Sequence, residues 1–349
     1  MQQFNPFYSA PPMEVINKIN KSAERNILRV RSNWLGAFFL FSFALQLIFT
    51  VVWELVATLL GVAGDTSSIV SSFEYILYSP LVSLLPIVIA VKAARVKITD
   101  IMPFEECGFS LGFALFLFGF GGILLGSLAS DAVYYLFPAT GYVFDMINTS
   151  SPETAGEYLA EILSSAAIPA LVEELVFRGI VLGMLRRYGD RFAIVVSALL
   201  FAVFHANFLQ MSLAFLIGLA LGYIVVKSGN LWPAIVLHFA NNVIATLYGI
   251  LYDLFCGAFA PIFQDESAVS LAFYIVQHVF YAVLFLIGWI LLRKHSKKHG
   301  EKKLCRGTVT CLTTVEKCKI CFLSPAFIIG VGWYIVEAVI LLYPITLTV

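Results

Sequence analysis

Apolar segments long enough to cross a lipid bilayer recur along almost the whole chain. A membrane-spanning helix needs about 20 mostly apolar residues. Hydrophobic residues make up 60% of the chain and charged residues 13%, whereas soluble domains have roughly 45–50% and 25%. A soluble fold could not hide this much apolar surface, so we predict an all-α, polytopic transmembrane helix bundle. The apolar runs predict eight spans, at approximately 34–61, 69–91, 110–137, 158–186, 192–208, 211–227, 232–252 and 269–292, with room for a ninth at 322–348.

The positions of Lys and Arg predict how the spans are oriented. Short loops rich in these residues lie in the cytoplasm, and eight alternating spans with a cytoplasmic N-terminus place every basic loop on that side. We therefore expect a multi-pass protein of the bacterial plasma membrane. Lys plus Arg equals Asp plus Glu, at 22 each, so no nucleic-acid partner is predicted. The basic loops contain Lys18, Lys21, Arg25, Arg29 and Arg31, then Lys92, Arg95 and Lys97, then Arg186, Arg187 and Arg191, then Lys227, and finally Arg293, Lys294, Lys297 and Lys298.

Small residues and helix signals predict local features of the bundle. Gly122 with Gly126, and Gly218 with Gly222, lie four residues apart, so each pair shares a helix face where two backbones can approach closely. Ser150 and Glu153 have the spacing of a capping box, which predicts a helix start there. Pro169 then predicts a kink within the fourth apolar segment.

The fourth apolar segment contains charged side chains at positions that are costly inside a membrane. It includes Glu173, Glu174 and Arg178, although a charge at the bilayer centre costs about 2.5–3.5 kcal/mol even on the lenient insertion scale. Glu174 and Arg178 lie four residues apart and can offset one another on one helix face. Glu173 points about 100° away, which leaves its carboxylate available for another task.

The next apolar segments add imidazole and amide groups. His205 ends the run Phe201-Ala202-Val203-Phe204-His205, and His238 lies four residues before Asn242. Peptide hydrolysis needs a base that activates water, and a shielded carboxylate such as Glu173, helped by His205, suits this task. It also needs donors for the developing oxyanion, which His238 and Asn242 can provide.

In this order, the motifs Glu-Glu-x-x-x-Arg, Phe-x-x-x-His and His-x-x-x-Asn resemble those of the CAAX protease and bacteriocin-processing family, also called the Abi family. This family includes the type II CAAX prenyl endopeptidases, and the resemblance covers roughly residues 165–250. It implies an intramembrane endopeptidase with Glu173 as catalytic glutamate, His205 as water-assisting histidine, and His238 and Asn242 as the oxyanion-stabilising pair. Glu174 and Arg178 would be supporting residues. The implied partner is a membrane-associated peptide or protein, either a prenylated CAAX protein or a bacteriocin or leader peptide.

The chain is accordingly expected to have four regions. These are a cytoplasmic N-terminal segment at 1–33, a transmembrane protease-like core at 34–293, a basic cysteine-containing cytoplasmic segment at 294–321, and a C-terminal span at 322–349.

Two alternatives concern the site itself. Glu173, His205 and His238 could supply the protein ligands of a catalytic zinc ion, although we prefer a metal-free mechanism in which Glu173 and His205 activate water directly. The polar residues could instead form the binding pocket of a non-proteolytic immunity or scaffold protein that holds a peptide partner.

Other polar residues lie outside the motifs. We expect Glu54 and His278 to hydrogen bond between helices or line a pore. The spacing of Cys318 and Cys321, with Cys305, Cys311, His295 and His299 upstream, leaves a second zinc site open, although a lone CxxC is weak support and unpaired thiols are the favoured interpretation.

Overall fold

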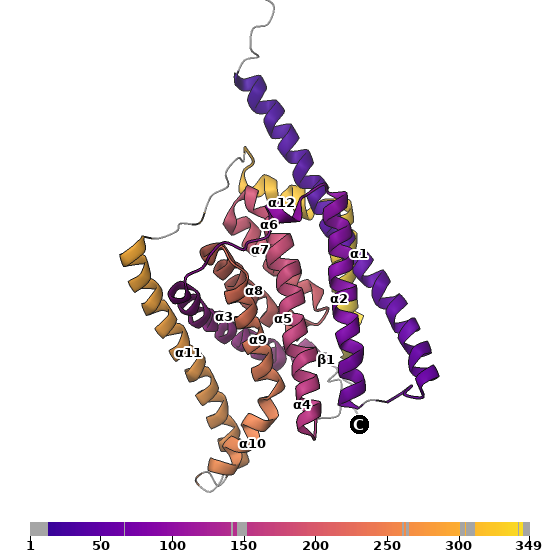
Figure 1. The fold of residues 1–349 in the computed structure, drawn as a ribbon, viewed down its shortest axis with the longest axis vertical. Coiled ribbons are helices and arrows are strands. Elements are labelled where there is room, and N and C mark those ends of the chain that lie inside the picture. Colours follow the sequence, from indigo (N-terminus) through magenta and orange to yellow (C-terminus); the bar gives the residue numbers. More distant parts are fainter. Residues whose placement is uncertain are drawn as a thin grey trace, which may run out of the picture.

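Helices form almost all of the described structure. The computed structural model describes residues 13–65, 67–140, 142–144, 152–259, 262, 265–300, 304, 311–340 and 342–344. Within them, the only strands are β1 (Tyr142–Phe144) and β2 (Leu342–Pro344), which pair antiparallel. The predicted all-α polytopic bundle is therefore confirmed (Figure 1). The longer helices are α1 (Met13–Leu60), α2 (Ser68–Ala93), α3 (Phe109–Leu136), α7 (Asp190–Phe204), α8 (Phe208–Ser228), α9 (Trp232–Thr246), α10 (Tyr248–Phe259), α11 (Glu266–His299), α12 (Thr314–Phe322) and α13 (Pro325–Ile340).

Each predicted apolar segment is helical, but not every one is a long single helix. Five helices within the described residues are long and apolar enough to cross a membrane, or up to seven if α9 with α10 and α12 with α13 each form one bent span. The bends are 57° and 71°. The fourth segment is helical but divided into short pieces, and α7 has 15 residues, or about 22 Å of helix. The count of eight spans therefore stays a prediction for these two segments.

The fourth segment alternates between α-helical and π-helical turns. It consists of α4 (Ala155–Glu161), the π-turns η3 (Ile162–Ala167), α5 (Ile168–Glu173), the π-turns η4 (Glu174–Val181) and α6 (Leu182–Leu185). Pro169 stands at the start of α5, where its missing N–H fits an interruption of regular α-helical bonding. Such π-turns are frequent at functional sites, and these two flank Glu173.

The start of this segment differs from the prediction. Ser150 lies outside the described residues, and α4 begins at Ala155 with Thr154 as its N-cap. The Thr154 hydroxyl accepts the backbone N–H of Glu157, and the carboxylate of Glu157 accepts the backbone N–H of Glu153. The predicted cap lies too early in the chain because Thr154 and Glu157 offer the same capping spacing a few residues later.

The predicted glycine pairs lie where helices touch. A Cβ on Gly122 would come within 2.5 Å of the Ala220 Cβ of α8, and one on Gly218 within 3.1 Å of the Ala198 Cα of α7. The glycines therefore let α3 and α7 pack closely on α8, as small residues do in membrane bundles. Helix α8 thus holds α7, and His205 directly after it, against the middle of the bundle.

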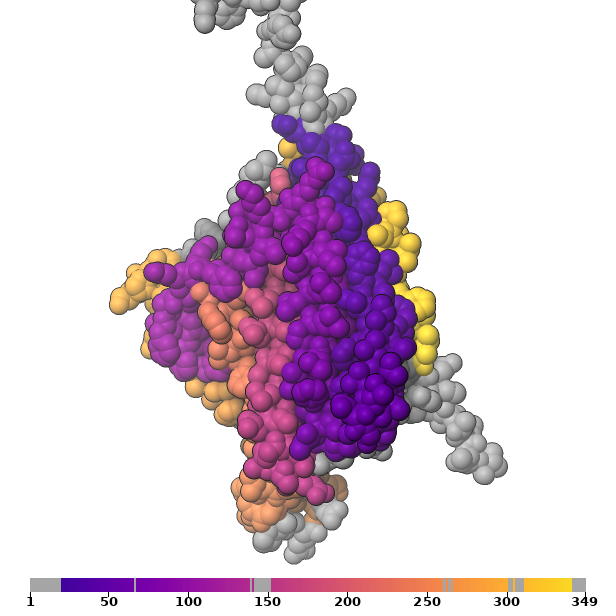
Figure 2. All heavy atoms as spheres, turned by 45° about the vertical axis from the view of Figure 1, so that its right-hand side comes forward, coloured from indigo at the N-terminus to yellow at the C-terminus, as the bar shows by residue number. Residues whose placement is uncertain are grey.

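Helix α13 packs along α1, although the two are far apart in the sequence. Figure 2 shows the yellow segment of α13 along the edge of the indigo helix α1. The two backbones come close at a pair of glycines, where a Cβ on Gly330 would overlap the carbonyl oxygen of Gly36. Tyr334 of α13 stacks on Phe204 of α7, with ring centroids 5.5 Å apart. Helix α13 therefore reaches the residue next to His205.

Substituting Ala for Gly330 is expected to destabilise the protein, because its methyl group would clash with the backbone of α1. Overpacking of this kind costs about 1–3 kcal/mol. Gly332, on the same helix, has no atom within 4 Å of the position that an added methyl group would take, so Gly332→Ala should leave stability unchanged or slightly higher. Thermal unfolding of both variants in detergent checks this, and equal melting temperatures would contradict the contact.

Candidate active site

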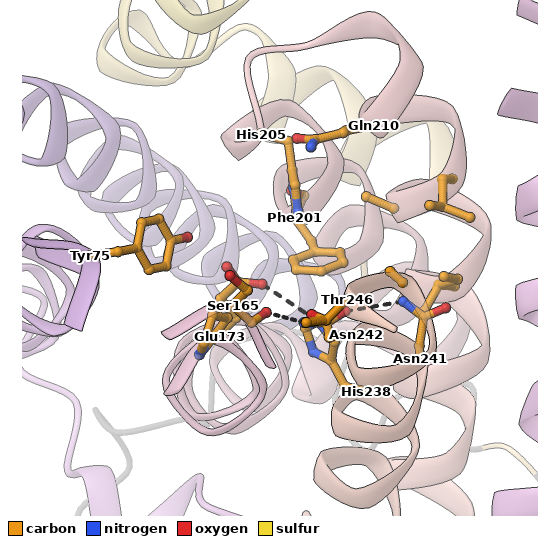
Figure 3. A pocket seen from close by; sticks show the side chains of 15 residues that line it. Tyr75, Ser165, Glu173, Phe201, His205, Gln210, His238, Asn241, Asn242 and Thr246 are labelled. Atoms are coloured by element: carbon orange, nitrogen blue, oxygen red, sulfur yellow. Dashed lines mark hydrogen bonds and ion pairs between the residues drawn. The ribbon is translucent and has the colours of Figure 1, made fainter. Parts of the chain in front are cut away.

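The predicted site residues line one cavity in the middle of the bundle. The cavity has a volume of about 400 Å³. Glu173 reaches it from the end of α5, His205 from the end of α7, and His238 and Asn242 from α9. Figure 3 shows these side chains around a common space, with Tyr75 of α2 on the opposite side. Glu174 and Arg178 do not line the cavity and lie behind it, both fully buried.

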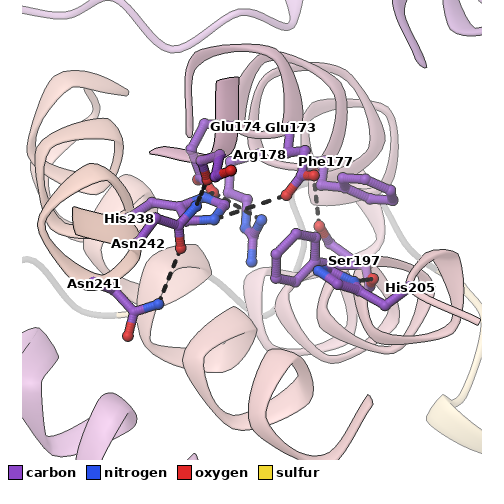
Figure 4. Close-up of polar contacts among 11 residues, drawn as sticks. Glu173, Glu174, Phe177, Arg178, Ser197, His205, His238, Asn241 and Asn242 are labelled. Carbon is purple, nitrogen blue, oxygen red and sulfur yellow. Dashed lines mark hydrogen bonds and ion pairs between the residues drawn. The ribbon is translucent and has the colours of Figure 1, made fainter. Parts of the chain in front are cut away.

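His238 lies between the two neighbouring carboxylates. Its Nδ1 donates to Glu174 Oε1 at 3.0 Å, and its Nε2 lies 3.7 Å from Glu173 Oε2 (Figure 4). The second distance is too long for a hydrogen bond but within the range of an ion pair. His238 is 5% exposed and Glu173 9%, so these groups interact with little screening by water. Glu173 thus faces the cavity while Glu174 lies behind it, and the imidazole of His238 lies between the two carboxylates.

Arg178 is held by a carboxylate on one side and an aromatic ring on the other. Its Nη1 donates to Glu174 Oε1 at 2.8 Å, as the four-residue spacing predicts. Its guanidinium carbon lies 4.0 Å from the ring centre of Phe201, a cation–π contact. The same Glu174 oxygen thus accepts from both Arg178 and His238, and it fixes the imidazole that faces the cavity.

The hydrogen bond of His205 determines which of its nitrogens can accept a proton. Its Nδ1 lies 2.8 Å from the carbonyl oxygen of Phe201. A carbonyl only accepts, so Nδ1 carries hydrogen and Nε2 holds the lone pair of the neutral ring. His205 is half-buried and lines the cavity. It therefore has the form that a proton acceptor needs.

Asn242 donates a hydrogen bond to the backbone carbonyl of Ser165, to which Pro169 cannot donate. In an α-helix, the carbonyl of Ser165 would accept the N–H four residues later, but that position is Pro169, which has none. The Ser165 carbonyl instead accepts Nδ2 of Asn242 at 3.2 Å, and Oδ1 of Asn242 accepts Nδ2 of Asn241 at 3.1 Å. An amide nitrogen carries two hydrogens, so one N–H of Asn242 remains for another acceptor.

The possible zinc ligands can be compared with the arrangement of His, Cys, Asp and Glu side chains in the structure. Glu173, His205 and His238 line the same cavity, yet no group of three or more His, Cys, Asp or Glu side chains in the described part of the chain is arranged to hold one metal ion. The same holds for the cysteine segment, where Cys305 lies outside the described residues and Cys321 is buried in α12 while Cys311 is exposed. Both zinc hypotheses therefore stay predictions from the sequence.

Phe201 is the residue to which the sequence motifs gave no role. Its ring contacts Arg178, lies edge-on to His205 with centroids 4.8 Å apart, and lies edge-on to His238 at 5.7 Å. The Phe201 ring thus contacts the guanidinium of Arg178 and both imidazoles of the site. The sequence could have predicted this contact with His205, because residues four apart lie on the same face of a helix. Tyr75 carried no such signal.

His278 belongs to a second polar cavity beside the first. That cavity has a volume of about 430 Å³ and shares the lining residues Leu213, Asn241 and Ala245 with the first. His278 Nδ1 donates to the Tyr274 carbonyl at 2.8 Å, and its Nε2 lies 3.9 Å from Asp131 of α3. His278 thus contacts a neighbouring helix away from the motif residues.

A comparison with family models finds a match over residues 155–244, to the family described as Type II CAAX prenyl endopeptidase Rce1-like. The matched segment runs from α4 into α9 and includes every motif residue discussed above. No curated protein and no solved structure matches the chain. The resemblance predicted from the motifs is thereby confirmed for this segment, and it supports peptidase activity within a membrane protein.

Proposed function

We propose that this membrane protein, whose residues 155–244 match the Rce1-like family of type II CAAX prenyl endopeptidases, is an intramembrane endopeptidase that cleaves a membrane-associated peptide. The observation that supports this most directly is the shared cavity. A carboxylate, two imidazoles and a side-chain amide from α5, α7 and α9 line one space of about 400 Å³. Hydrolysis of a peptide bond needs a base, an oxyanion partner and a proton donor within reach of one carbonyl.

Glu173 and His205 are proposed to activate the attacking water. The water oxygen forms a bond to the carbonyl carbon of the peptide while its proton passes to Glu173 or to Nε2 of His205. The lone pair on Nε2 follows from the bond between Nδ1 and the Phe201 carbonyl. When the tetrahedral intermediate collapses, the carbon–nitrogen bond breaks and the stored proton moves to the leaving amine.

His238 and Asn242 are proposed to stabilise the oxyanion. His238 donates Nδ1–H to Glu174, so it can offer a second N–H from Nε2 only when both nitrogens are protonated. With His238 protonated on both nitrogens, the negative charges of Glu173 and Glu174 balance the positive charges of Arg178 and His238. The net charge of the four groups is then zero. Neutral clusters are favoured where water is scarce, so this arrangement suits a donor that must face a negative oxygen.

The mechanism is proposed to need no metal ion. If so, a chelator such as 1,10-phenanthroline leaves the cleavage rate of purified protein unchanged within about twofold, less than the loss expected when a catalytic Lewis acid is removed. Loss of activity that added Zn²⁺ restores would instead assign a metal to the site and overturn this part of the proposal.

The substrate is proposed to reach the cavity from the membrane, either as a prenylated CAAX-type protein or as a bacteriocin or leader peptide. The N-terminus is proposed to lie in the cytoplasm of a bacterial cell, because Lys and Arg gather at or just after the C-terminal ends of α2, α6, α8 and α11.

Cleavage by the purified protein tests the proposal. The full chain is reconstituted in vesicles with a library of prenylated and unprenylated membrane-anchored peptides, and products are identified by mass spectrometry. We expect cleavage of at least one class, with loss of the activity in His205→Ala. A library that binds but remains intact with wild-type protein would instead favour a non-proteolytic immunity or scaffold role.

Restoring a backbone donor at position 169 is expected to slow cleavage. In Pro169→Ala, the new N–H competes with Asn242 for the Ser165 carbonyl, so Asn242 loses its anchor. Misplacing one oxyanion donor should lower kcat on the order of tenfold or more. Pro80, inside α2 and away from the cavity, is the control: Pro80→Ala should keep kcat. Equal kcat in Pro169→Ala and wild type would contradict the role of this carbonyl.

A further inference from the structure

A further cavity, at the end of the bundle and distinct from the two described above, is lined by cationic side chains from separate parts of the chain. It has a volume of about 600 Å³, and it lies where α1, the turn after α2 and the end of α6 meet (Figure 1). Five cationic and two anionic residues line it, so at neutral pH the lining carries a net charge of five minus two, or +3. These residues are Arg31, Arg95, Lys97, Arg186 and Arg187 against Asp100 and Asp190.

Much of this positive charge is not offset by carboxylates. Arg186 Nε pairs with Asp190 Oδ1 at 3.0 Å. Arg95, Lys97 and Arg187, by contrast, make no ion pair with a carboxylate among the described residues. The general excess of Lys and Arg in cytoplasmic loops would explain cations that are scattered over the surface. It does not explain why these cations line one cavity.

The walls of the cavity are built by close contacts. The guanidinium of Arg31 donates to the carbonyl oxygen of Met184 at the end of α6, which ties α1 to the motif-bearing segment. A Cβ on Gly183 would lie 2.5 Å from the carbonyl oxygen of Ile101, so the turn after α2 rests directly on α6. The cations are therefore held around the hollow by packed backbone.

The position of the cavity in the bundle indicates which kind of anion it could bind. Arg31 lies just before the apolar part of α1, Lys97 follows α2, and Arg186 follows α6. Arg31 itself lies within α1, but Lys97 and Arg186 mark the ends of α2 and α6, the level at which lipid headgroups lie. Basic pockets between helix ends are suited to phosphate groups of anionic lipids, and guanidinium groups bind phosphate oxygens through paired donors.

We propose that this cavity binds the phosphate headgroup of an anionic membrane lipid, at a site separate from the catalytic cavity. Gly183 and Glu173 lie ten residues apart on the same helical segment, and neither the residues nor the space of the two cavities is shared. The lipid site does not depend on the proposed protease activity, so it should persist in Glu173→Gln.

Binding of fluorescent phosphatidylglycerol to the purified full-length protein tests the proposal. The variant Arg95→Gln with Lys97→Gln removes two exposed cations whose side chains pair with no carboxylate in the described part of the chain, so the fold should survive. We expect its affinity to fall at least about tenfold, because both cations face the phosphate and each contributes to holding it. Arg31→Gln, which keeps a donor for Met184, should also weaken binding.

Arg191→Gln is the matched control. Arg191 lies at the start of α7, a few residues after Arg187, and it does not line this cavity. Its affinity should change less than about twofold, since a charge outside the hollow is screened by salt and water. Phosphatidylcholine with the same chains should bind weakly to every variant. Equal binding by the double variant and wild type would overturn the site, as would an equal loss in Arg191→Gln. Saturation by inorganic phosphate at the same concentrations would assign the cavity to free phosphate and overturn the lipid assignment.

Discussion

Replacing Glu173 by Gln is expected to abolish peptide cleavage while leaving the protein folded. The amide has nearly the shape of the carboxylate but cannot accept a proton from water, and loss of a general base lowers rates about 10²–10⁴-fold. His238 Nε2 lies 3.7 Å from its carboxylate, so the substitution breaks no short hydrogen bond between these two side chains. The measurement is kcat on a membrane-anchored reporter in vesicles, with substrate binding measured separately.

The control for this experiment is Glu106→Gln, which makes the same chemical change at an exposed position outside the cavity. It should retain wild-type kcat. Glu173→Gln should bind the reporter with a Kd close to that of wild type, because the proposed role lies in the chemical step. Full activity of both Glu173→Gln and Glu173→Ala would reject this glutamate as the base.

Replacing Arg178 by Met is expected to have the largest effect on stability. It leaves the fully buried Glu174 carboxylate without its guanidinium partner at 2.8 Å, and breaking a buried pair from one side costs about 3–5 kcal/mol. It also removes the contact between Arg178 and Phe201. Thermal unfolding of the purified protein should show a clear fall in Tm, together with loss of activity.

A second substitution separates charge from packing. In Glu174→Gln with Arg178→Met, no buried carboxylate is stranded at position 174, and Gln can still accept from His238. The double variant should therefore be more stable than Arg178→Met alone, as coupled neighbours predict. Additive losses from the two substitutions would mean that the pair has no energetic coupling.

The helical bundle could be predicted from the sequence because apolar length is a local property. Each run of about 20 apolar residues is helical in the structure, and Gly218 and Gly122 marked real contacts between helices. The π-turns on both sides of Glu173 could not be predicted in this way. They depend on how the segment fits between α2, α8 and α9, which side-chain hydrophobicity does not encode. The bends after α9 and α12 escaped prediction for the same reason.

The site was predicted as a set of residue types, and the structure adds how those residues are connected. Spacing of four residues correctly paired Glu174 with Arg178. It could not show that His238, far along the chain, bridges Glu174 and Glu173, or that Pro169 frees a carbonyl for Asn242. These links join different helices, so they arise only from tertiary packing. The roles assigned to the residues remain predictions for the variants above to test.

The contact between Gly36 and Gly330 has a consequence for biosynthesis. The ribosome makes α1 long before α13, so the nascent chain must lengthen through the whole motif-bearing segment before α1 gains this partner. Until then the flank of α7 at Phe204 lacks the Tyr334 ring that covers it. Chains that stop before Pro325 should therefore be targets for membrane quality control, because they leave uncovered the surfaces of α1 and α7 that α13 contacts.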